Sequence, residues 1–167
     1  GLYKSVDGGA TFSLMAGLPK FIPQRAAFDG DGNLFVTLSN GRAPWGGDNG
    51  AVYRLDAKTG EWRDISPMKP GGANSNFAYC GLDVDPQKPG TVVVSTMNRW
   101  ALHDDIYLSR DGGRHWKPLG PQSRHDPAGY PWLIDYMKGE DRMGHWIADV
   151  KIDPFNSDRL IYGTGYG

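Results

Sequence analysis

Side chains that could bind a sugar stand together at residues 98–100, where Asn98, Arg99 and Trp100 follow the apolar run 92–97. An indole ring can stack on the apolar face of a sugar, and an amide or a guanidinium can form hydrogen bonds with its hydroxyl groups. The run 92–97 is rich in β-branched residues and predicts a strand, so these three residues are expected in the loop that follows it. The pattern indicates a carbohydrate-binding position at the end of a strand.

Other tryptophans are found where loops are expected. Trp45 lies in the Gly-rich segment 40–49, and Trp132 and Trp146 lie in a long insertion, residues 120–146. Loops of this length are more often functional than decorative. We therefore regard Trp45, Trp132 and Trp146 as further candidates for contacts with a sugar.

Two neighbouring carboxylates, Asp104 and Asp105, could also take part in chemistry, because a pair of acids can raise the pKa of one of them. Adjacent residues on a strand point to opposite faces, which argues against a catalytic pair. Their expected roles are then to bind sugar hydroxyls or simply to be solvated. His103 and His125 each precede an Asp, but these residues and His145 lack the spacing of zinc ligands, so we predict no metal. We also predict no cofactor.

Two copies of one turn pattern, at 5–12 and 109–116, must help to position these residues. In each copy a strand leads into a tight turn, in which Gly supplies a positive φ, Asp accepts N–H groups of its own turn, and an aromatic residue opens the return strand. The matching residues are Ser5, Asp7, Gly9 and Phe12 in the first copy and Ser109, Asp111, Gly113 and Trp116 in the second. We expect these residues to hold the fold and to carry no chemistry.

The spacing of these turns predicts a repeat. Asp7 and Asp111 are 111 − 7 = 104 positions apart, and a degenerate copy at 52–62 lies midway between them. A second signature, an apolar strand that ends in Asp and is followed by a β-branched run, occurs at 27–37, 82–96 and 150–164. Four short strands in each period of about 50 residues predict an all-β fold built of propeller blades.

The repeat predicts the following organisation: a partial blade at 1–16, complete blades at about 26–66 and 81–119, the insertion loop at 120–146 and a partial blade at 147–167. A propeller closes with about four to eight blades. Two complete blades cannot close a ring, so we expect the chain to be a piece of a longer protein that supplies the remaining blades.

Composition excludes several classes of partner. The formal net charge is −1 over 167 residues, and Lys and Arg are spread along the chain rather than clustered. This distribution predicts neither a nucleic-acid nor an anionic-membrane surface. The single cysteine, Cys80, excludes an internal disulfide and is expected to be a buried structural thiol.

The turn pattern resembles the Asp box of sialidases, sortilin-type receptors and polysaccharide hydrolases, where it staples the outer hairpin of a propeller blade. The order of motifs is more specific, and it is similar to that of the xyloglucan-degrading enzymes of glycoside hydrolase family 74. The motifs concerned are 27–37, 50–55, 60–65, 81–85, 98–100, the second turn pattern and 152–165. Two departures are residues 101–103, where many members have a second aromatic residue and Pro, and His115, which replaces the usual Thr of the box.

The resemblance implies two seven-bladed propellers that face each other across a cleft and cleave the β-1,4-glucan backbone of xyloglucan. Cleavage with inversion needs one Asp as acid and another as base. In the family these residues lie in T-D-x-G-G-A-Y and G-D-x-G-G-F motifs, and neither motif occurs here. The resemblance therefore implies that this chain holds no catalytic residue and supplies cleft surface for a polysaccharide or oligosaccharide. It further implies a parent protein that is secreted or periplasmic and contains a second propeller.

Two alternatives remain from other classes of protein. A non-enzymatic propeller, such as a sortilin-like receptor or an assembly factor, would have the same Asp boxes. A sialidase would need an Arg cluster to hold the carboxylate of its sugar, and the segment 21–25 does not match the early Arg-Ile-Pro motif of that class.

Overall fold

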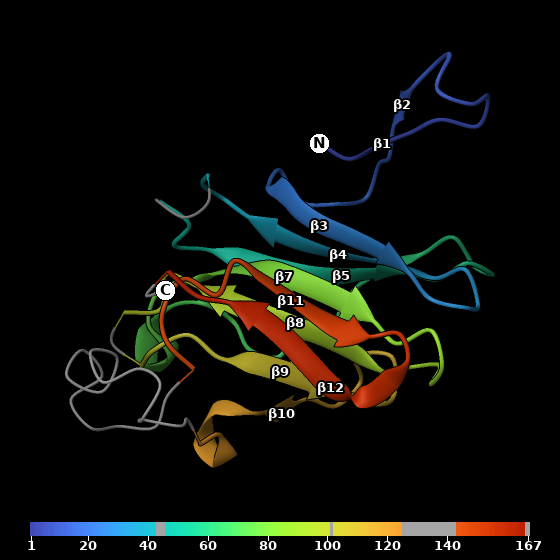
Figure 1. The fold of residues 1–167 in the computed structure, drawn as a ribbon. Helices are drawn as coiled ribbons and strands as arrows, with labels where there is room; N and C mark the ends of the chain where they lie inside the picture. The colour runs from blue at the N-terminus through green and yellow to red at the C-terminus, as the bar shows by residue number, and fades with distance from the viewer. Residues whose placement is uncertain (43–45, 101, 125–142, 166–167) are drawn as a thin grey trace.

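The computed structural model describes residues 1–42, 46–100, 102–124 and 143–165, in which antiparallel sheets are joined by loops (Figure 1). The first four-stranded sheet has the order β3-β4-β5-β6, formed by Ile22–Phe28, Leu34–Ser39, Gly50–Leu55 and Trp62–Asp64. The second has the order β7-β8-β9-β10, formed by Ala78–Val84, Val92–Met97, Ile106–Ser109 and Lys117–Pro118. Each sheet therefore pairs its strands in chain order.

Two hairpins flank these sheets in the sequence. The hairpin β1-β2 joins Tyr3–Lys4 to Ser13–Leu14, and the hairpin β11-β12 joins Asp149–Asp153 to Asn156–Gly163. Within the described ranges the helical segments are two short 3-10 turns, η1 at Gly72–Asn74 and η2 at Gly120–Gln122. The expected all-β fold, with two four-stranded blades between two partial ones, is confirmed. In the same ranges, no helix has the length and apolar character needed to cross a membrane.

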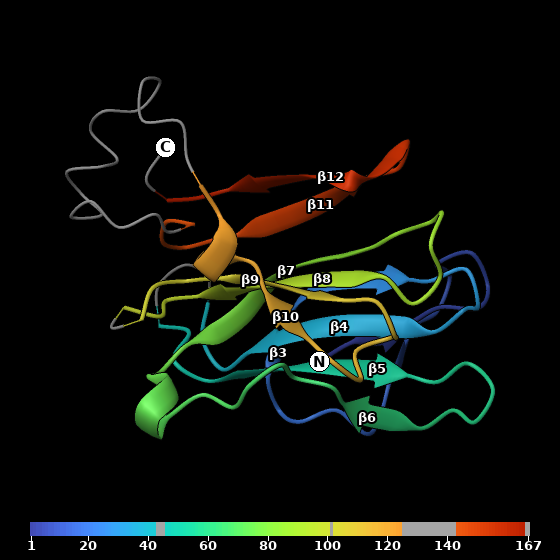
Figure 2. The ribbon, with the colours of Figure 1, turned by 90° about the horizontal axis from the view of Figure 1, so that it is seen from below.

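The sheets stand next to one another as successive layers (Figure 2). Strand β7, the first of its sheet, contacts both β3 and β11, the first strands of the neighbouring sheets. Figure 1 shows the hairpin β1-β2 standing apart from this stack. The strands β3, β7 and β11, each the first of its sheet, thus lie on a common side of the molecule.

Alternating side chains of β8 explain why the layers pack on both sides. Successive residues of a strand point to opposite faces. Val92 and Val94 are fully buried in one cluster with Phe35 of the first sheet, whereas Val93 is buried in another cluster with Ile147 and other residues near β11. A continuous run of β-branched residues therefore forms a strand that is apolar on both faces.

Buried hydroxyl groups fasten each sheet to the next. Thr37 of β4 donates to the carbonyl of Cys80 in β7 at 2.6 Å, and Ser95 of β8 donates to the carbonyl of Ile147, just before β11, also at 2.6 Å. Ser95 also accepts the N–H of Gly81 at 2.8 Å. Cys80 is buried as expected, and its thiol donates to the carbonyl of Ala148 at 3.1 Å.

The Asp boxes, residues 5–12 and 109–116, form turns that are closed by side-chain hydrogen bonds. Asp7 accepts the N–H and the hydroxyl of Thr11 at 2.9 and 2.6 Å, while Ser5 accepts the N–H of Gly9 at 2.8 Å. In the second box, Ser109 accepts the N–H of Gly113 at 2.9 Å in the same way.

The aromatic residues that follow the two boxes differ in burial. Trp116 is half-buried, and its indole N–H donates at 2.7 Å to the carbonyl of Ile65, which directly follows β6 of the preceding sheet. Phe12 is 65% exposed. In the second box the closing aromatic therefore also links two sheets, which the sequence pattern did not show.

Candidate functional site

The loop that leaves β8 brings the residues 98–100 to one end of the second sheet. Its residues precede β9, whereas the second Asp box follows β9, so the two features lie at opposite ends of that strand. Asn98 adopts a left-handed conformation with a φ of 73°, which turns the chain as soon as β8 ends. Trp100 is 55% exposed, so a large part of its indole ring is open to solvent.

The exposed ring of Trp100 is held by specific contacts. Its Nε1–H donates to Oδ1 of Asn98 at 2.7 Å. Its centroid lies 4.0 Å from the imidazole ring of His145, and 5.3 Å from the indole ring of Trp146 at an interplanar angle of 88°. Edge-to-face aromatic contacts of this kind are favourable because the ring edge is positive and the face is negative. The structure therefore places Trp146, which the sequence identified in a different segment, beside Asn98 and Trp100.

Asp104 is buried beneath these aromatic rings and joins the two segments that carry them. Its carboxylate accepts the N–H groups of Asn98, Arg99 and Trp146 at 3.2, 3.1 and 2.7 Å. It also lies 2.9 Å from Nδ1 of His145. A carboxylate with this many donors satisfies the rule that a buried charge must be hydrogen-bonded. The sequence predicted a group that was solvated or contacted sugar, but the structure places it behind the surface.

Asp105 is also buried and bonded to the backbone. It accepts the N–H groups of Ile106 and Gly120, each at 2.7 Å. Burial raises the pKa of the Asp105 carboxyl. A Cβ at position 120 would lie within about 3 Å of this carboxyl group, so a residue larger than Gly would not fit there without a shift. Asp105 therefore fastens the start of the segment 120–146 to β9, and it is not the solvated acid that the sequence suggested.

Arg99 has a different environment from the one that the sequence suggested. It is 8% exposed, its Nε–H donates to the carbonyl of Asn74 at 3.1 Å, and its guanidinium carbon lies 5.5 Å from the centre of the Phe77 ring. Its guanidinium thus faces the loop between β6 and β7 rather than the open side of Trp100.

Trp146 forms the partly buried side of the cluster. Its ring packs against the buried residues Ala78, Cys80 and Met97. A Cβ at Gly165 would come within 2.5 Å of this indole ring, so the chain after β12 passes directly against it. Trp45 and Trp132, the other tryptophans predicted to contact sugar, lie outside the described residues.

Backbone strain is concentrated around these residues. Positive φ values outside glycine occur in the described ranges at Ser75, Asn98, His103 and Trp146, with values of 62°, 73°, 61° and 54°. Ser75 follows Asn74, the residue bonded to Arg99, so all four lie in or next to the same group of loops. Such conformations are costly for a bulky residue such as Trp and are found preferentially at functional sites. The strained residues therefore lie at the same end of the sheets as the candidate site.

A polar hollow of about 300 Å³ lies beside the loop to which Asn98 is bonded. It is lined by Asn40, Asp48, Asn49, Pro70, Gly71 and Asn76. Asn98 donates to the carbonyl of Gly47 at 3.2 Å, and this bond connects the aromatic loop to the loop that forms one wall of the hollow. Amide and carboxylate side chains of this kind suit sugar hydroxyl groups. Sequence reasoning missed the asparagines because they lie on separate loops of the first sheet and of its connection to the second.

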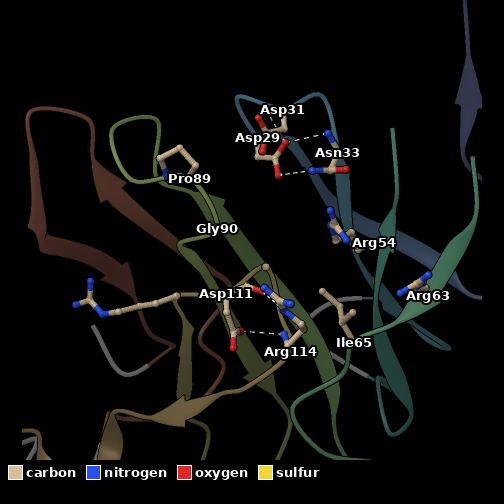
Figure 3. A pocket seen from close by; sticks show the side chains of 12 residues that line it. Asp29, Asp31, Asn33, Arg54, Arg63, Ile65, Pro89, Gly90, Asp111 and Arg114 are labelled. Carbon is tan, nitrogen blue, oxygen red and sulfur yellow. Dashed lines mark hydrogen bonds between the residues drawn. The ribbon is translucent and has the colours of Figure 1, made fainter. Parts of the chain in front are cut away.

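A second hollow, of about 480 Å³, lies at the other end of the sheets (Figure 3). Arg54, Arg63 and Arg114 line it together with Asp29 and Asp111. The carboxylates there serve their own turns, since Asp29 accepts from the backbone and side chain of Asn33 and Asp111 accepts from the N–H of Arg114. Neither acid is placed as a general acid or base. Within the described ranges, no group of three or more His, Cys, Asp or Glu side chains is arranged to hold a metal ion.

Comparisons with known proteins agree with this arrangement. The chain is 38% identical to a xyloglucanase from Paenibacillus over 98% of its own length and 17% of that protein, and 34% identical to one from Acetivibrio thermocellus over 98% and 21%. It is 29% identical to a probable oligoxyloglucan-reducing end-specific xyloglucanase from Neosartorya fischeri over 99% and 28%. The chain thus spans between 17% and 28% of the length of these curated relatives. No protein-family model matches it.

Solved structures show the same similarity in three dimensions. The crystal structure of the family 74 xyloglucanase from Xanthomonas campestris superimposes on 99% of the chain with a TM-score of 0.88 and 31% identity, and the chain covers 23% of that protein. The family 74 enzyme from Niastella koreensis superimposes on 96% of the chain with a TM-score of 0.77 and 32% identity, again over 23% of its length. The ordered blades, the aromatic loop after β8 and these matches together show that the chain matches one segment of the enzymes of glycoside hydrolase family 74.

Proposed function

We propose that the protein is a glycoside hydrolase that cleaves the β-1,4-glucan backbone of xyloglucan-type polysaccharides, and that residues 1–167 supply part of its substrate cleft. The observation that carries this proposal is the exposed ring of Trp100. The ring is fixed by Asn98 and backed by His145 and Trp146, so it presents an ordered stacking face. The names of the relatives support xyloglucan as the substrate.

Within this proposal, residues 1–167 bind substrate and the two catalytic acids of an inverting mechanism come from other parts of the protein. Inversion requires an acid and a base on opposite sides of the scissile bond with room for water between them. Asp104 and Asp105 are buried and committed to backbone donors, and Asp111 serves its own turn. These environments support a structural role for all three carboxylates, which hold the backbone of neighbouring segments in place.

The proposal is tested by the variant Trp100→Ala in the full-length protein, assayed with xyloglucan oligosaccharides. Loss of one aromatic stacking contact corresponds to a weakening of about 2- to 10-fold. Stacking holds substrate and transition state alike, so KM should rise by this factor while kcat changes less. The matched control is Phe155→Ala, because Phe155 is an exposed aromatic residue, 90% accessible, in the turn between β11 and β12.

Two results of this experiment would contradict the proposal. A large fall in melting temperature with an unchanged KM would assign Trp100 to the core. If the folded Trp100→Ala variant binds oligosaccharide as tightly as the parent, the site is not a glycan-binding surface.

The names of the relatives favour a hydrolase over the receptor and assembly-factor alternatives. The inward-facing guanidinium of Arg99 gives the sialidase alternative no support at this site.

A further inference from the structure

We propose that His145 is a positioning residue that holds the indole ring of Trp100 in the orientation that stacks on a sugar. The inference rests on the proposed function, because it concerns the same glycan-binding face. It goes beyond that function by assigning a role to a histidine that never contacts the ligand. His145 is 1% exposed, so a sugar on the open face of Trp100 cannot reach it.

The aromatic geometry supports this role. The imidazole ring of His145 lies 4.0 Å from the Trp100 ring and 4.9 Å from the Trp146 ring, at interplanar angles of 51° and 39°. It therefore contacts both indole rings and supports the inner side of Trp100. Trp100 stands on an exposed loop. Without such support its side chain would be mobile in the free protein, and the entropy lost when a ligand immobilised it would weaken the affinity.

Asp104 fixes the orientation of the imidazole. Nδ1 of His145 lies 2.9 Å from Oδ2 of Asp104, and a carboxylate at that distance accepts a hydrogen bond from Nδ1–H. The same carboxylate accepts the N–H groups of Asn98 and Arg99, which immediately precede Trp100 in the chain. The Asp104 carboxylate therefore positions both the loop that carries Trp100 and the imidazole ring that Trp100 contacts.

A second fixed point holds the backbone of His145. Its carbonyl accepts the N–H of Gly165 at 2.8 Å, and the neighbouring carbonyl of Ile147 accepts the hydroxyl of buried Ser95. The imidazole thus projects from a segment that is fastened to β8 on one side and to the end of β12 on the other. A rigid support of this kind is what a preorganised binding side chain requires.

The test is a double-mutant cycle on the full-length protein, with the dissociation constant of a xyloglucan oligosaccharide measured by calorimetry. His145→Ala should weaken binding by about 2- to 10-fold, the range expected from the loss of one aromatic contact. In a Trp100→Ala background the same substitution should weaken binding no further, because the residue acts through Trp100. Independent, additive losses would overturn the proposal.

Two further variants separate the ring of His145 from its hydrogen bond and protect the test if His145→Ala unfolds. His145→Phe keeps a ring beside Trp100 and should bind within about twofold of the parent. His145→Asn keeps a donor toward Asp104 but has no ring, and it should bind as weakly as His145→Ala. The reverse order would show that the hydrogen bond alone matters and would overturn the role assigned to the ring.

A readout without ligand distinguishes this inference from the proposed function. The indole N–H signal of Trp100, assigned as the resonance missing from Trp100→Ala, should shift and exchange faster in His145→Asn because its bond to Asn98 loosens. If Trp100→Ala leaves affinity unchanged while this signal still moves, the proposed function fails and the positioning contact stands. If Trp100→Ala weakens binding but the His145 variants change neither the signal nor the affinity, the positioning role alone is refuted.

Discussion

His115 makes the contact with Asp111 that Thr11 makes with Asp7 in the first Asp box. Nδ1 of His115 lies 2.6 Å from Oδ2 of Asp111, and the hydroxyl of Thr11 lies 2.6 Å from Oδ2 of Asp7. In each box the N–H of the same residue also donates to Oδ1 of the acid, at 2.9 Å. The backbone N–H and the ring of His115 hold the pKa of Asp111 well below its usual range. A departure from the family pattern therefore keeps the hydrogen bonding of the box.

This equivalence predicts the effect of two substitutions on stability. Asp111→Ala should lower the melting temperature by several degrees, because the N–H groups of Arg114 and His115 lose their acceptor. His115→Thr should melt close to the parent, because a Thr hydroxyl makes the same bond in the first box. The control for Asp111→Ala is Asp31→Ala, since Asp31 lies in a turn that is organised by Asp29. Equal losses from Asp111→Ala and Asp31→Ala would contradict a special role for the box acid.

The turn of the first Asp box should lose stability in acid, at a pH set by the pKa of Asp7. The hydroxyl and N–H of Thr11, together with the hydroxyl of Ser5, lower the pKa of Asp7 from 3.8 to about 2. Because the pKa is lower in the folded state, the ionised carboxylate stabilises the turn fully above pH 3.8 and loses this contribution as the pH falls through about 2. An NMR titration of the Thr11 amide should have its midpoint near pH 2. A midpoint close to 3.8 would show that the turn does not hold the carboxylate.

Removing the hydroxyl of Ser95 should weaken the junction between β8 and the segment that leads into β11. Ser95→Ala leaves the N–H of Gly81 and the carbonyl of Ile147 without this buried partner, and an unsatisfied buried group costs about 1–3 kcal/mol. The free energy of unfolding in denaturant measures the loss. Ser13→Ala is the control, since its hydroxyl lies on an exposed strand. A Ser95→Ala variant as stable as this control would show that the bond does not fasten the two sheets.

Gly81 is required where β7 and β11 approach each other. A Cβ at this position would lie 2.5 Å from Oγ of Ser95 and 2.9 Å from the backbone nitrogen of Val150. Gly81→Ala should therefore destabilise the protein by about 1–3 kcal/mol, the usual effect of overpacking. Gly30→Ala is the matched control, because a Cβ there would meet no atom within 4 Å. Thermal melts of the two variants make the comparison, and a neutral Gly81→Ala would mean that the sheets separate easily.

The sequence by itself determined the repeat and the strands. The turn patterns around Asp7 and Asp111 and the run 92–97 encode local structure, because turn chemistry and strand alternation depend on residues only a few positions apart. The spacing of the two turn patterns then indicated the repeat. The same local signals placed Trp100 at the end of a strand, and the order of motifs indicated the family.

Only the tertiary structure decided which polar residues near Trp100 face outward. Asp104 is buried because the N–H of Trp146, 42 positions further along the chain, lies within hydrogen-bond distance of its carboxylate. Arg99 turns inward because the carbonyl of Asn74 and the ring of Phe77 meet it from another loop. The exposure of a side chain depends on the segments that pack over it, and sequence proximity carries no information about segments that come from a neighbouring blade.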